Sequence, residues 1–575
     1  MAVRTAGRAL AGAALALVAA LVPATTQAAG PPPGAPGPGQ DHPPRHRTAD
    51  LPVFTSTGAI VDPLDETLPH NPNQEFIFPS VFHAGAHLAD PLGEWYVYYA
   101  PHDDPGGINL MYADSLDGPW TQYEGSPVVA NRWEGVYDVP HVSSPDAVWN
   151  PDERRMYLYF HGDNRVTRYA TSTDGVTFEY GGEAVTTAMV DAAQPGRRAT
   201  ETSYARVFPN PDRSSPQRWA MLFMTNYDTN VRHINLAYSR DGRDWEVRPE
   251  PIVTPGPAEG VNVSAADLWR WRGQDYVVYG STVGTIFARP VDRTLTDVGD
   301  PEPLFVPNPA PPEAGRASSP QIVTHRGRTH MVYEYGERSH TTVGHAVLDP
   351  DGVRDPLNTH PEDPLYAQCT GAGSDELDGD ALDRSVWSTS VRGDLDRSVV
   401  ADGAWHLPTY PGNSTSAPLV LRPAPGGPWQ VTTQLTLDPE VNFQQAGLIL
   451  RRDDATSLRV DVSHVDAGKR FDFVWRRDGV DRNDAWTAED SALAPPETGD
   501  TVWLRMTHHG EWLTASYSID GVTFRNLGRA APADELAATD LGPFAYRGPE
   551  ATPELTASFD WVRFTPTAEE LATCS

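Results

Sequence analysis

Cysteine is scarce in this sequence of 575 residues, which contains only Cys369 and Cys574. Two cysteines fall short of the ligand set of a cysteine-based metal site, so such a site is excluded. In an exported chain, two cysteines predict one disulfide. We expect the Cys369–Cys574 bridge to join the two ends of a C-terminal domain.

Basic residues are also few. Lys and Arg number 44 against 77 Asp and Glu, which gives a formal net charge of −33. Nucleic acids and anionic membranes both attract basic surfaces, so we expect neither as a partner. A surplus of acidic residues is typical of a soluble secreted protein.

Long apolar runs are confined to the N-terminus. Arg4 and Arg8 precede "ALAGAALALVAALVPA", and small residues follow up to Ala28. This pattern predicts a signal peptide over residues 1–28 and therefore a secreted, extracellular protein. The alternative is a membrane anchor, but the run is short for a span and leads into a Pro/Gly-rich linker, residues 29–50. No later stretch reaches the ~18 apolar residues of a membrane span.

Helical periodicity is scarce, and short strands repeat instead. Five segments share a short strand, a turn and a second strand rich in aromatic or β-branched residues, and three of them end in an Asp-Gly hairpin. The first strands contain "PSVF", "SSPDAVW", "TSYARVF", "SAADLW" and "SSPQIV". This repetition predicts a five-bladed β-propeller over residues 51–366 and favours it over one long β-sandwich. An aromatic residue after each Asp-Gly pair (Trp120, Phe178 and Trp245) is expected to pack between blades.

The last part of the chain, residues 367–575, has a different pattern. Alternating strands such as "QVTTQLTLD" and "SLRVDVSHV" predict a β-sandwich of the jelly-roll type. The chain is therefore expected to be all-β, with a propeller followed by a sandwich, and to be monomeric.

In a propeller, the start of each inner strand and the end of the next strand meet at one face near the axis. Applied to all five repeats, this geometry gives a polar mouth suited to hydroxyl-rich sugars. The candidate residues are Ser80 and His102 in blade one; His141, Asp146 and His161 in blade two; Glu201, Tyr204, Arg206 and Asn226 in blade three; Asp267 and Ser281 in blade four; and Ser319 and Glu334 in blade five.

Two carboxyl groups and two histidines are the candidates for catalysis. Glycoside hydrolysis ordinarily uses an acid and a base or nucleophile, and we assign Asp146 and Glu201 to this pair, with Asp267 in reserve. His102 and His161 end the second strands of blades one and two, and we expect them at equivalent places. The alternatives are a turn-capping role for Asp146, a surface position for Glu201, and solvated loop tips for the histidines.

The segments "DELDGDALDRSVW", "FQQAGLILRRDD", "GPFAYRG" and "FDWVRF" occur in this order in the C-terminal part. With them, this part resembles the concanavalin-like domain that follows the propeller in family 43 glycoside hydrolases. Through "PSVF", "SSPDAVW" with "MYLYF", and the Asp-Gly hairpins, the propeller resembles the superfamily of families 43, 32 and 117. The resemblance implies a secreted glycosidase that acts on a carbohydrate.

One departure from family 43 concerns catalysis. The family carries its base Asp immediately before the blade-one "PSV", and here that position is Phe78. The places of its other two acids are occupied by "TSYARV" and "SAADLW". The catalytic triad of the family is therefore not carried over.

Three functions stay open. The first is a glycoside hydrolase of a polysaccharide or oligosaccharide, which uses carboxylates at the propeller axis. The second is a polysaccharide lyase that acts on a uronate, with His102 or His161 as base and with Arg206 and either Arg165 or Arg168 to neutralise the substrate. The third is a non-catalytic glycan-binding protein, which Phe78 favours.

No cofactor is expected for this chemistry. A structural calcium ion is one interpretation of Asp378, Asp380 and Asp560, because carboxylate oxygens are the ligands that Ca²⁺ prefers. Turn formation by Asp-Gly is the alternative.

Overall fold

The computed structural model describes residues 51–60, 75–101, 106–256, 259–260, 262–308, 313, 315–336, 341–350, 370–393, 395–465, 468–482, 494, 498–509, 511–521 and 524–573. The expected signal peptide, the linker, His102 and both cysteines lie outside the described residues. In the described part of the chain, no helix is long and apolar enough to cross a membrane.

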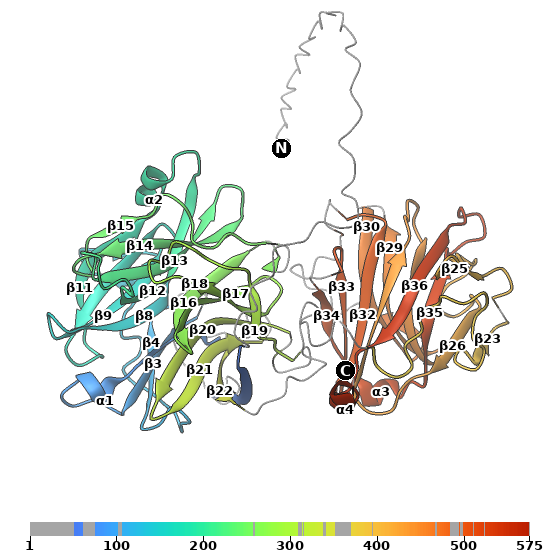
Figure 1. Cartoon of the computed structure of the whole chain (residues 1–575), viewed down its shortest axis with the longest axis horizontal. Helices are drawn as coiled ribbons and strands as arrows, with labels where there is room; N and C mark the ends of the chain where they lie inside the picture. Colours follow the sequence, from blue (N-terminus) through green and yellow to red (C-terminus); the bar gives the residue numbers. More distant parts are fainter. Residues whose placement is uncertain are drawn as a thin grey trace, which may run out of the picture. The chain divides into compact units, whose positions relative to one another are not determined.

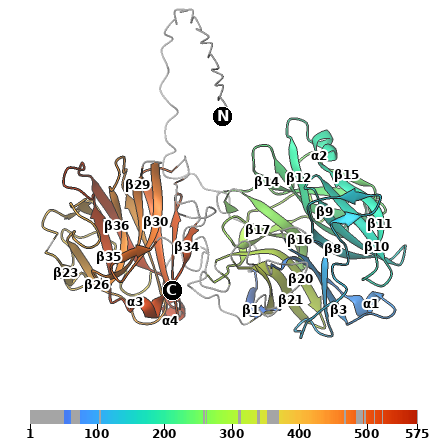
Figure 2. The ribbon, with the colours of Figure 1, turned by 180° about the vertical axis from the view of Figure 1, so that it is seen from behind.

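Five four-stranded antiparallel sheets form the blades of a propeller (Figures 1 and 2). Blade one contains β2 (Ile77–Phe82), β3 (Trp95–Ala100), β4 (Asn109–Ala113) and β5 (Thr121–Gln122). Blade two contains β8 (Val142–Asn150), β9 (Arg155–Gly162), β10 (Val166–Ser172) and β11 (Glu179–Thr186). Blade three contains β12 (Ala199–Pro209), β13 (Trp219–Tyr227), β14 (Arg232–Ser239) and β15 (Trp245–Val247). Blade four contains β16 (Val263–Trp271), β17 (Gln274–Ser281), β18 (Ile286–Val291) and β19 (Glu302–Phe305). The inner strands β2, β8, β12, β16 and β20 contact one another in a ring.

Blade five is completed by the first strand of the described chain. Its sheet has the order β20 (Ala317–His325), β21 (Arg328–Tyr335), β22 (Thr342–Asp349) and β1 (Val53–Ala59). The outer strand therefore comes from the start of the chain, which explains why the fifth repeat lacks an Asp-Gly tail. This pairing closes the ring between the last blade and the first.

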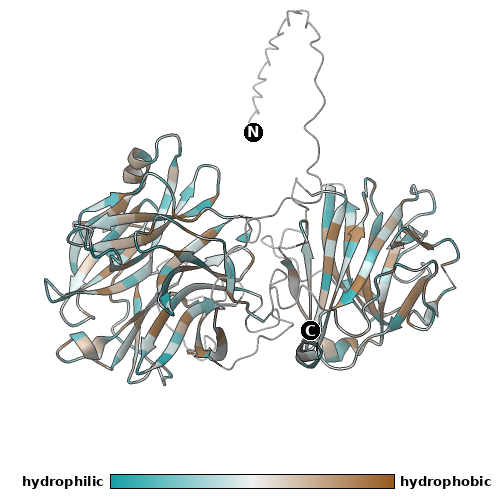
Figure 3. Ribbon diagram, viewed as in Figure 1, coloured by the Kyte–Doolittle hydropathy of each residue, from teal (hydrophilic) through white to brown (hydrophobic). Residues whose placement is uncertain are grey.

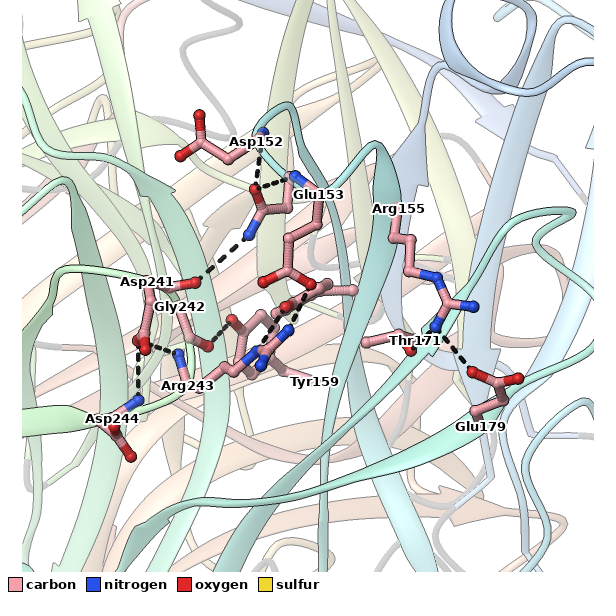
Figure 4. A network of polar contacts seen from close by, with 12 residues as sticks. Asp152, Glu153, Arg155, Tyr159, Thr171, Glu179, Asp241, Gly242, Arg243 and Asp244 are labelled. Atoms are coloured by element: carbon pink, nitrogen blue, oxygen red, sulfur yellow. Dashed lines mark hydrogen bonds and ion pairs between the residues drawn. The ribbon is translucent and has the colours of Figure 1, made fainter.

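The Asp-Gly turns hold neighbouring blades together. Tyr98 of blade one donates its hydroxyl to the carbonyl of Gly175 at 2.7 Å, and Tyr159 of blade two donates to that of Gly242 at 2.5 Å (Figure 4). Both glycines have positive φ, 77° and 82°, which favours glycine over other residues. Phe178 packs edge-on against Tyr98, as expected for an aromatic residue between blades.

The C-terminal part is a sandwich of two seven-stranded sheets. One sheet has the order β23 (Thr389–Val391), β26 (Leu419–Pro423), β35 (Asp540–Tyr546), β28 (Gln445–Asp453), β29 (Thr456–Val465), β30 (Gly468–Arg477) and β31 (Val480–Arg482). The other has the order β24 (Val399–Ala401), β25 (Ala404–Pro408), β36 (Thr556–Phe564), β27 (Trp429–Thr436), β32 (Thr501–His509), β33 (Trp512–Ser518) and β34 (Arg525–Pro532). Hydrophobic and hydrophilic residues alternate along these strands (Figure 3), which gives one buried core between the sheets.

The remaining elements are short. They are β6 (Arg132–Trp133), β7 (Tyr137–Asp138), α1 (Ala84–His87), α2 (Thr187–Ala193), α3 (Ala533–Leu536) and α4 (Ala568–Thr573). The predicted all-β architecture of a five-bladed propeller followed by a sandwich is confirmed.

Candidate active site

A β-bulge interrupts the inner strand of every blade at the same place. Each bulge contains one residue with φ between 50° and 55°, and none of these residues is glycine. They are Phe78, Ser144, Tyr204, Ala265 and Ser319. The left-handed conformation is unfavourable for non-glycine residues by roughly 1–2 kcal/mol, so five equivalent positions around the axis each lower the stability of the fold. Such strain is frequent where side chains are re-aimed at a site.

Two residues after the left-handed residue of the bulge, each inner strand carries a polar side chain, and we call this set the lower ring. Its members are Ser80, Asp146, Arg206, Asp267 and Gln321. Arg206 donates to the carbonyl of Pro145 in blade two at 2.7 Å and to that of Pro79 in blade one at 2.5 Å. Its guanidinium therefore ties three blades together at the axis.

The carboxylate of Asp146 is part of the same clasp. It lies 3.4 Å from the guanidinium of Arg206 and accepts the backbone N–H of Val207 at 2.7 Å. Asp146 is only 2% exposed. Burial raises the pKa of Asp146, and Arg206 opposes this shift. These contacts favour a structural role between blades two and three. This role differs from the turn-capping alternative, because Asp146 lies within β8.

Asp267 and Ser80 are two further members of the lower ring. Burial raises the pKa of Asp267 to about 7; Arg206 lowers it and Asp146 raises it further. Ser80 is fully buried and accepts the N–H of Ala147 at 2.9 Å. The predicted binding residues Ser80, Arg206 and Asp267 therefore interact mainly with the protein itself.

Three residues before the left-handed residue of the bulge, each blade again carries a polar residue, and we call this set the upper ring. Its members are Glu75, His141, Glu201, Asn262 and Arg316. The sequence interpretation included His141 and Glu201 and missed the other three. The signal available in the sequence was a polar residue at one fixed distance before each inner-strand motif.

Two carboxylates lie on the upper-ring side of the bulges: Glu201, the upper-ring residue of blade three, and Glu334, which pairs with Ser318 in blade five. Glu201 accepts the hydroxyl of Ser203 at 2.9 Å and lies 3.8 Å from Arg232, whose side chain is 34% exposed. Glu334, at 1% exposure, is more deeply placed. Glu334 accepts hydrogen bonds from Ser319 at 2.9 Å, from the N–H of Phe78 at 3.1 Å and from Arg316. These donors belong to blades five and one.

The charges of both glutamates and of their partner arginines act on the hydroxyl of Tyr204. Burial raises the pKa of its hydroxyl to about 12; Glu201 and Glu334 also raise it, while Arg232 and Arg316 lower it. The ring of Tyr204 meets that of Phe78 edge-on, with centroids 4.6 Å apart. Blades one and three therefore touch across the axis through Phe78.

The histidines of blade two lie beside this cluster. The rings of His141 and His161 are 5.3 Å apart, and that of His161 is 6.3 Å from Tyr204. Ser143 pairs with His161, and the equivalent Ile77 of blade one pairs with Ala100. His102 lies outside the described residues, so its equivalence with His161 stays a prediction.

Of the remaining predicted residues, Asn226 lies beside Glu201 and the three acids of the expected calcium site lie in the sandwich. Asn226 pairs with Glu201 between β12 and β13, and its amide reaches the side chain of Asn230 at 3.4 Å. Asp378 and Asp380 are exposed, whereas Asp560 is half-buried and accepts the amide of Gln434. In the described part of the chain, these three acids do not form a group with ligand atoms within 4.8 Å of one another. Their calcium site stays a prediction.

Two of the three arginines named for a lyase are held by contacts with the protein. Arg206 holds the lower ring, and Arg168 is 6% exposed and donates to the carbonyl of Gly162 at 3.0 Å. Arg165 is exposed. The cations paired with Glu201 and Glu334 are instead Arg232 and Arg316.

Residues 410–565 match the family model of the beta xylosidase C-terminal concanavalin A-like domain. The match lies within the sandwich, and it confirms the resemblance of this part of the chain. The chain thus combines a five-bladed propeller with a C-terminal domain of this family. A search of curated proteins found no match.

Several solved structures are similar in fold. A xylan beta-1,4-xylosidase from Bacillus halodurans is 14% identical, with 90% of this chain and 99% of that chain covered and a TM-score of 0.34. A mutant of the GH43 protein BlXynB from Bacillus licheniformis is 15% identical, with coverages of 86% and 98% and a TM-score of 0.33. A GH32 beta-fructofuranosidase from Bombyx mori is 12% identical, with coverages of 90% and 93% and a TM-score of 0.36. These likenesses concern the fold.

Proposed function

We propose that the chain is a glycoside hydrolase that cleaves a polysaccharide or an oligosaccharide at the upper ring of the propeller. The observation that carries this proposal is that Glu201 and Glu334 come from different blades and their charges both raise the pKa of the Tyr204 hydroxyl. Hydrolysis of a glycosidic bond ordinarily needs one carboxyl group that protonates the leaving oxygen and a second that acts as base or nucleophile. These two glutamates supply such a pair.

The contacts of the two glutamates assign their roles. Glu334 is fixed by donors from Arg316, Ser319 and the backbone of Phe78, so we assign it as the carboxylate that acts as base or nucleophile. Glu201 is more accessible, with 11% of its side chain exposed, and we assign it as the general acid. Glu334 thus takes the place that the sequence interpretation gave to Asp146, which already serves Arg206 and Val207.

The C-terminal domain supports a carbohydrate substrate, because the family that it matches is named after beta xylosidases. We further propose that the protein is secreted as a monomer after cleavage near Ala28 and that Cys369 and Cys574 form a disulfide. N-terminal sequencing of the exported protein and mass mapping of a non-reduced digest test these two points. Cleavage elsewhere or two free thiols would contradict them.

The function is tested by incubating the purified full chain with a panel of polysaccharides and aryl glycosides. We expect release of reducing sugar from at least one substrate. Removal of the base or nucleophile by Glu334→Gln should abolish turnover. Azide or formate should restore part of the activity in Glu334→Ala, because the shorter side chain leaves room for a small anion in the place of the lost carboxylate. The surface variant Glu179→Gln is the matched control and should behave as wild type. Full activity of Glu334→Gln contradicts the proposal.

A polysaccharide lyase is the second candidate. The observation that favours it is the pair Arg232 and Arg316, whose side chains are 34% and 30% exposed and whose charges both lower the pKa of Tyr204. In β-elimination, a base removes a proton next to a uronate carboxylate that a cation neutralises, and the product contains a new double bond. Ultraviolet absorbance of an unsaturated uronide would identify this reaction.

A glycan-binding protein without catalysis is the remaining alternative, and Phe78 in place of an acid favours it. Binding of a glycan without reducing sugar or unsaturated product would identify it. Phe78→Asp would then be informative, since Asp tolerates the positive φ of 55° at this position better than Phe.

A further inference from the structure

The seam between blades five and one is built differently from the other seams with an Asp-Gly turn. At one position of the second strand, facing the next blade, the five blades carry Tyr96, Tyr157, Ala220, Tyr276 and His330, in order. In blade two, Tyr157 accepts a hydrogen bond from Arg243 in the Asp-Gly turn of blade three at 2.9 Å. Blade five presents His330 to the corresponding turn of blade one.

A second histidine replaces an apolar or aromatic residue at the same seam. On the third strand, the equivalent position carries Leu110, Tyr169, Leu236, Ala288 and His345 in the five blades. His330 and His345 are 4% and 3% exposed. Buried positions that hold tyrosine, leucine or alanine in the other repeats thus hold two imidazoles in blade five alone.

The two rings face each other through their nitrogens. Nδ1 of His330 lies 2.9 Å from Nε2 of His345. On the far side of His345, Nδ1 lies 2.6 Å from the hydroxyl of Thr57 in β1, and this hydroxyl donates to the carbonyl of His345 at 3.1 Å. When the Thr57 proton is used there, Nδ1–H of His345 donates to the Thr57 oxygen. In this tautomer, Nε2 of His345 carries a lone pair directed at His330.

A carboxylate completes the group. Asp117 of the Asp-Gly turn in blade one lies with His330 and His345 so that one ligand atom of each falls within 4.8 Å of the others. Its side chain is 46% exposed, and it pairs with Arg328 at 2.8 Å. In the turns of blades two and three, by contrast, Asp174 and Asp241 accept N–H groups of their own turns.

We propose that His330, His345 and Asp117 form a site for a divalent transition metal of the zinc type, which ties blade five to blade one. Figures 1 and 2 show these blades side by side, with β20 and β21 next to β3, and the inner strands β2 and β20 are in contact. The site lies on blade strands and turns away from the upper ring, so it is independent of the proposed hydrolysis.

The ligand chemistry favours zinc over calcium. Two imidazoles and one carboxylate are a common ligand set for Zn²⁺, whereas Ca²⁺ takes mainly oxygen ligands. With Zn–N distances of about 2.0–2.1 Å, tetrahedral geometry separates two nitrogens by about 3.3 Å. The observed 2.9 Å needs an opening of only a few tenths of an ångström. A water molecule would fill the fourth position, since Asp117 opens to solvent.

Thr57 is the positioning residue of this site. A metal-bound histidine usually donates its other N–H to an oxygen that fixes its ring and tautomer. Thr57 does this from β1, the strand that closes the propeller. The bound ion would therefore connect blade one, blade five and the N-terminal strand, which are far apart in sequence, and stabilise the closed ring because it binds only the folded state.

The test is a titration of the chelator-treated full chain, without a histidine tag, with Zn²⁺ in a calorimeter and with Co²⁺ in a spectrophotometer. Wild type should bind one Zn²⁺ per chain, gain visible Co²⁺ bands and melt at a higher temperature with the ion. His330→Gln and His345→Gln should lose at least ~100-fold in affinity, and Thr57→Val should lose roughly 10–100-fold. His233→Gln, a half-buried histidine of blade three, should retain wild-type affinity.

Failure to bind Zn²⁺ at micromolar concentrations by wild type would overturn the proposal. Wild-type affinity in both His330→Gln and His345→Gln would also do so. If these buried variants do not fold, the Zn²⁺ affinities of Thr57→Val and Asp117→Asn test the site, because these substitutions alter only exposed side chains. Unchanged Zn²⁺ affinity in both of these variants would then contradict the site.

Discussion

The upper and lower rings of the propeller contain the same kinds of residue and differ in what those residues contact. In the lower ring, Asp146 and Arg206 satisfy each other and the backbone of neighbouring blades. On the upper-ring side of the bulges, Glu201 and Glu334 both raise the pKa of Tyr204, and the arginines paired with them are about a third exposed. The two rings lie five positions apart along the chain in each blade, with the left-handed residue of the bulge between them. An acid in an inner strand is therefore assigned a role by its side of the bulge.

The largest effect is expected when the upper ring loses its proposed acid. Glu201→Gln should lower kcat by roughly 10²–10⁴-fold, the usual contribution of a general acid. The loss should be smaller on aryl glycosides with good leaving groups, because these need less protonation. Steady-state kinetics on both substrate types measure this difference. An equal loss on both would remove Glu201 from the role of acid.

Asp146→Asn is the matching change in the lower ring and should act on stability. It leaves Arg206 as a buried charge without its partner, which costs about 3 kcal/mol of the free energy of unfolding. Urea denaturation followed by tryptophan fluorescence measures this loss. Asp152→Asn, which alters an exposed ion pair with Arg218, is the control and should change the stability by less than about 0.5 kcal/mol.

Asp267 makes the stability of the lower ring depend on pH. Its pKa in the folded protein, about 7, lies above its ordinary value of 3.8. The folded state therefore retains the proton longer than the unfolded state, and wild type loses stability as pH rises from about 4 to about 7. Each pKa unit corresponds to about 1.4 kcal/mol, and partial exposure reduces the total to roughly 1–2 kcal/mol.

Asp267→Asn should remove this pH dependence, since an amide does not titrate. Relative to wild type, the variant should gain stability between pH 5 and pH 8. Denaturation of both proteins at the two pH values provides the comparison. The same difference in stability at both values would contradict the shifted pKa.

The smallest effect is expected from Ser80→Ala. Removal of the hydroxyl leaves the buried N–H of Ala147 without its acceptor, which costs about 1–2 kcal/mol. The kcat should stay within about twofold of wild type, because the hydroxyl is part of the lower ring. A large loss of activity in a folded Ser80→Ala protein would place Ser80 in contact with substrate.

The repeats in the sequence were sufficient to predict the five blades but not how the ring closes. Strands rich in tyrosine and Asp-Gly turns indicate blades because they form one repeated hairpin pattern. The outer strand of blade five comes from residues 53–59, and no local pattern links this strand to residues 342–349. Alignment of Tyr96 and Tyr98 with Tyr157 and Tyr159 would have placed Ala100 at the position equivalent to His161.

The candidate site was predicted only in part, because the bulges are not visible in the sequence. A left-handed residue is usually glycine, yet Phe78 and Tyr204 adopt this conformation here. Without the bulges, Asp146 and Glu201 appear equivalent as acids at the start of an inner strand. Arg232 and Arg316 were missed because their contacts with glutamates join separate strands.

The most direct test measures kcat and the free energy of unfolding together for Glu201→Gln and Asp146→Asn. We predict that Glu201→Gln loses activity and keeps its stability, whereas Asp146→Asn loses stability and keeps its kcat while folded. The reverse pattern, with an active Glu201→Gln and a stable but inactive Asp146→Asn, would contradict the division of roles between the two rings.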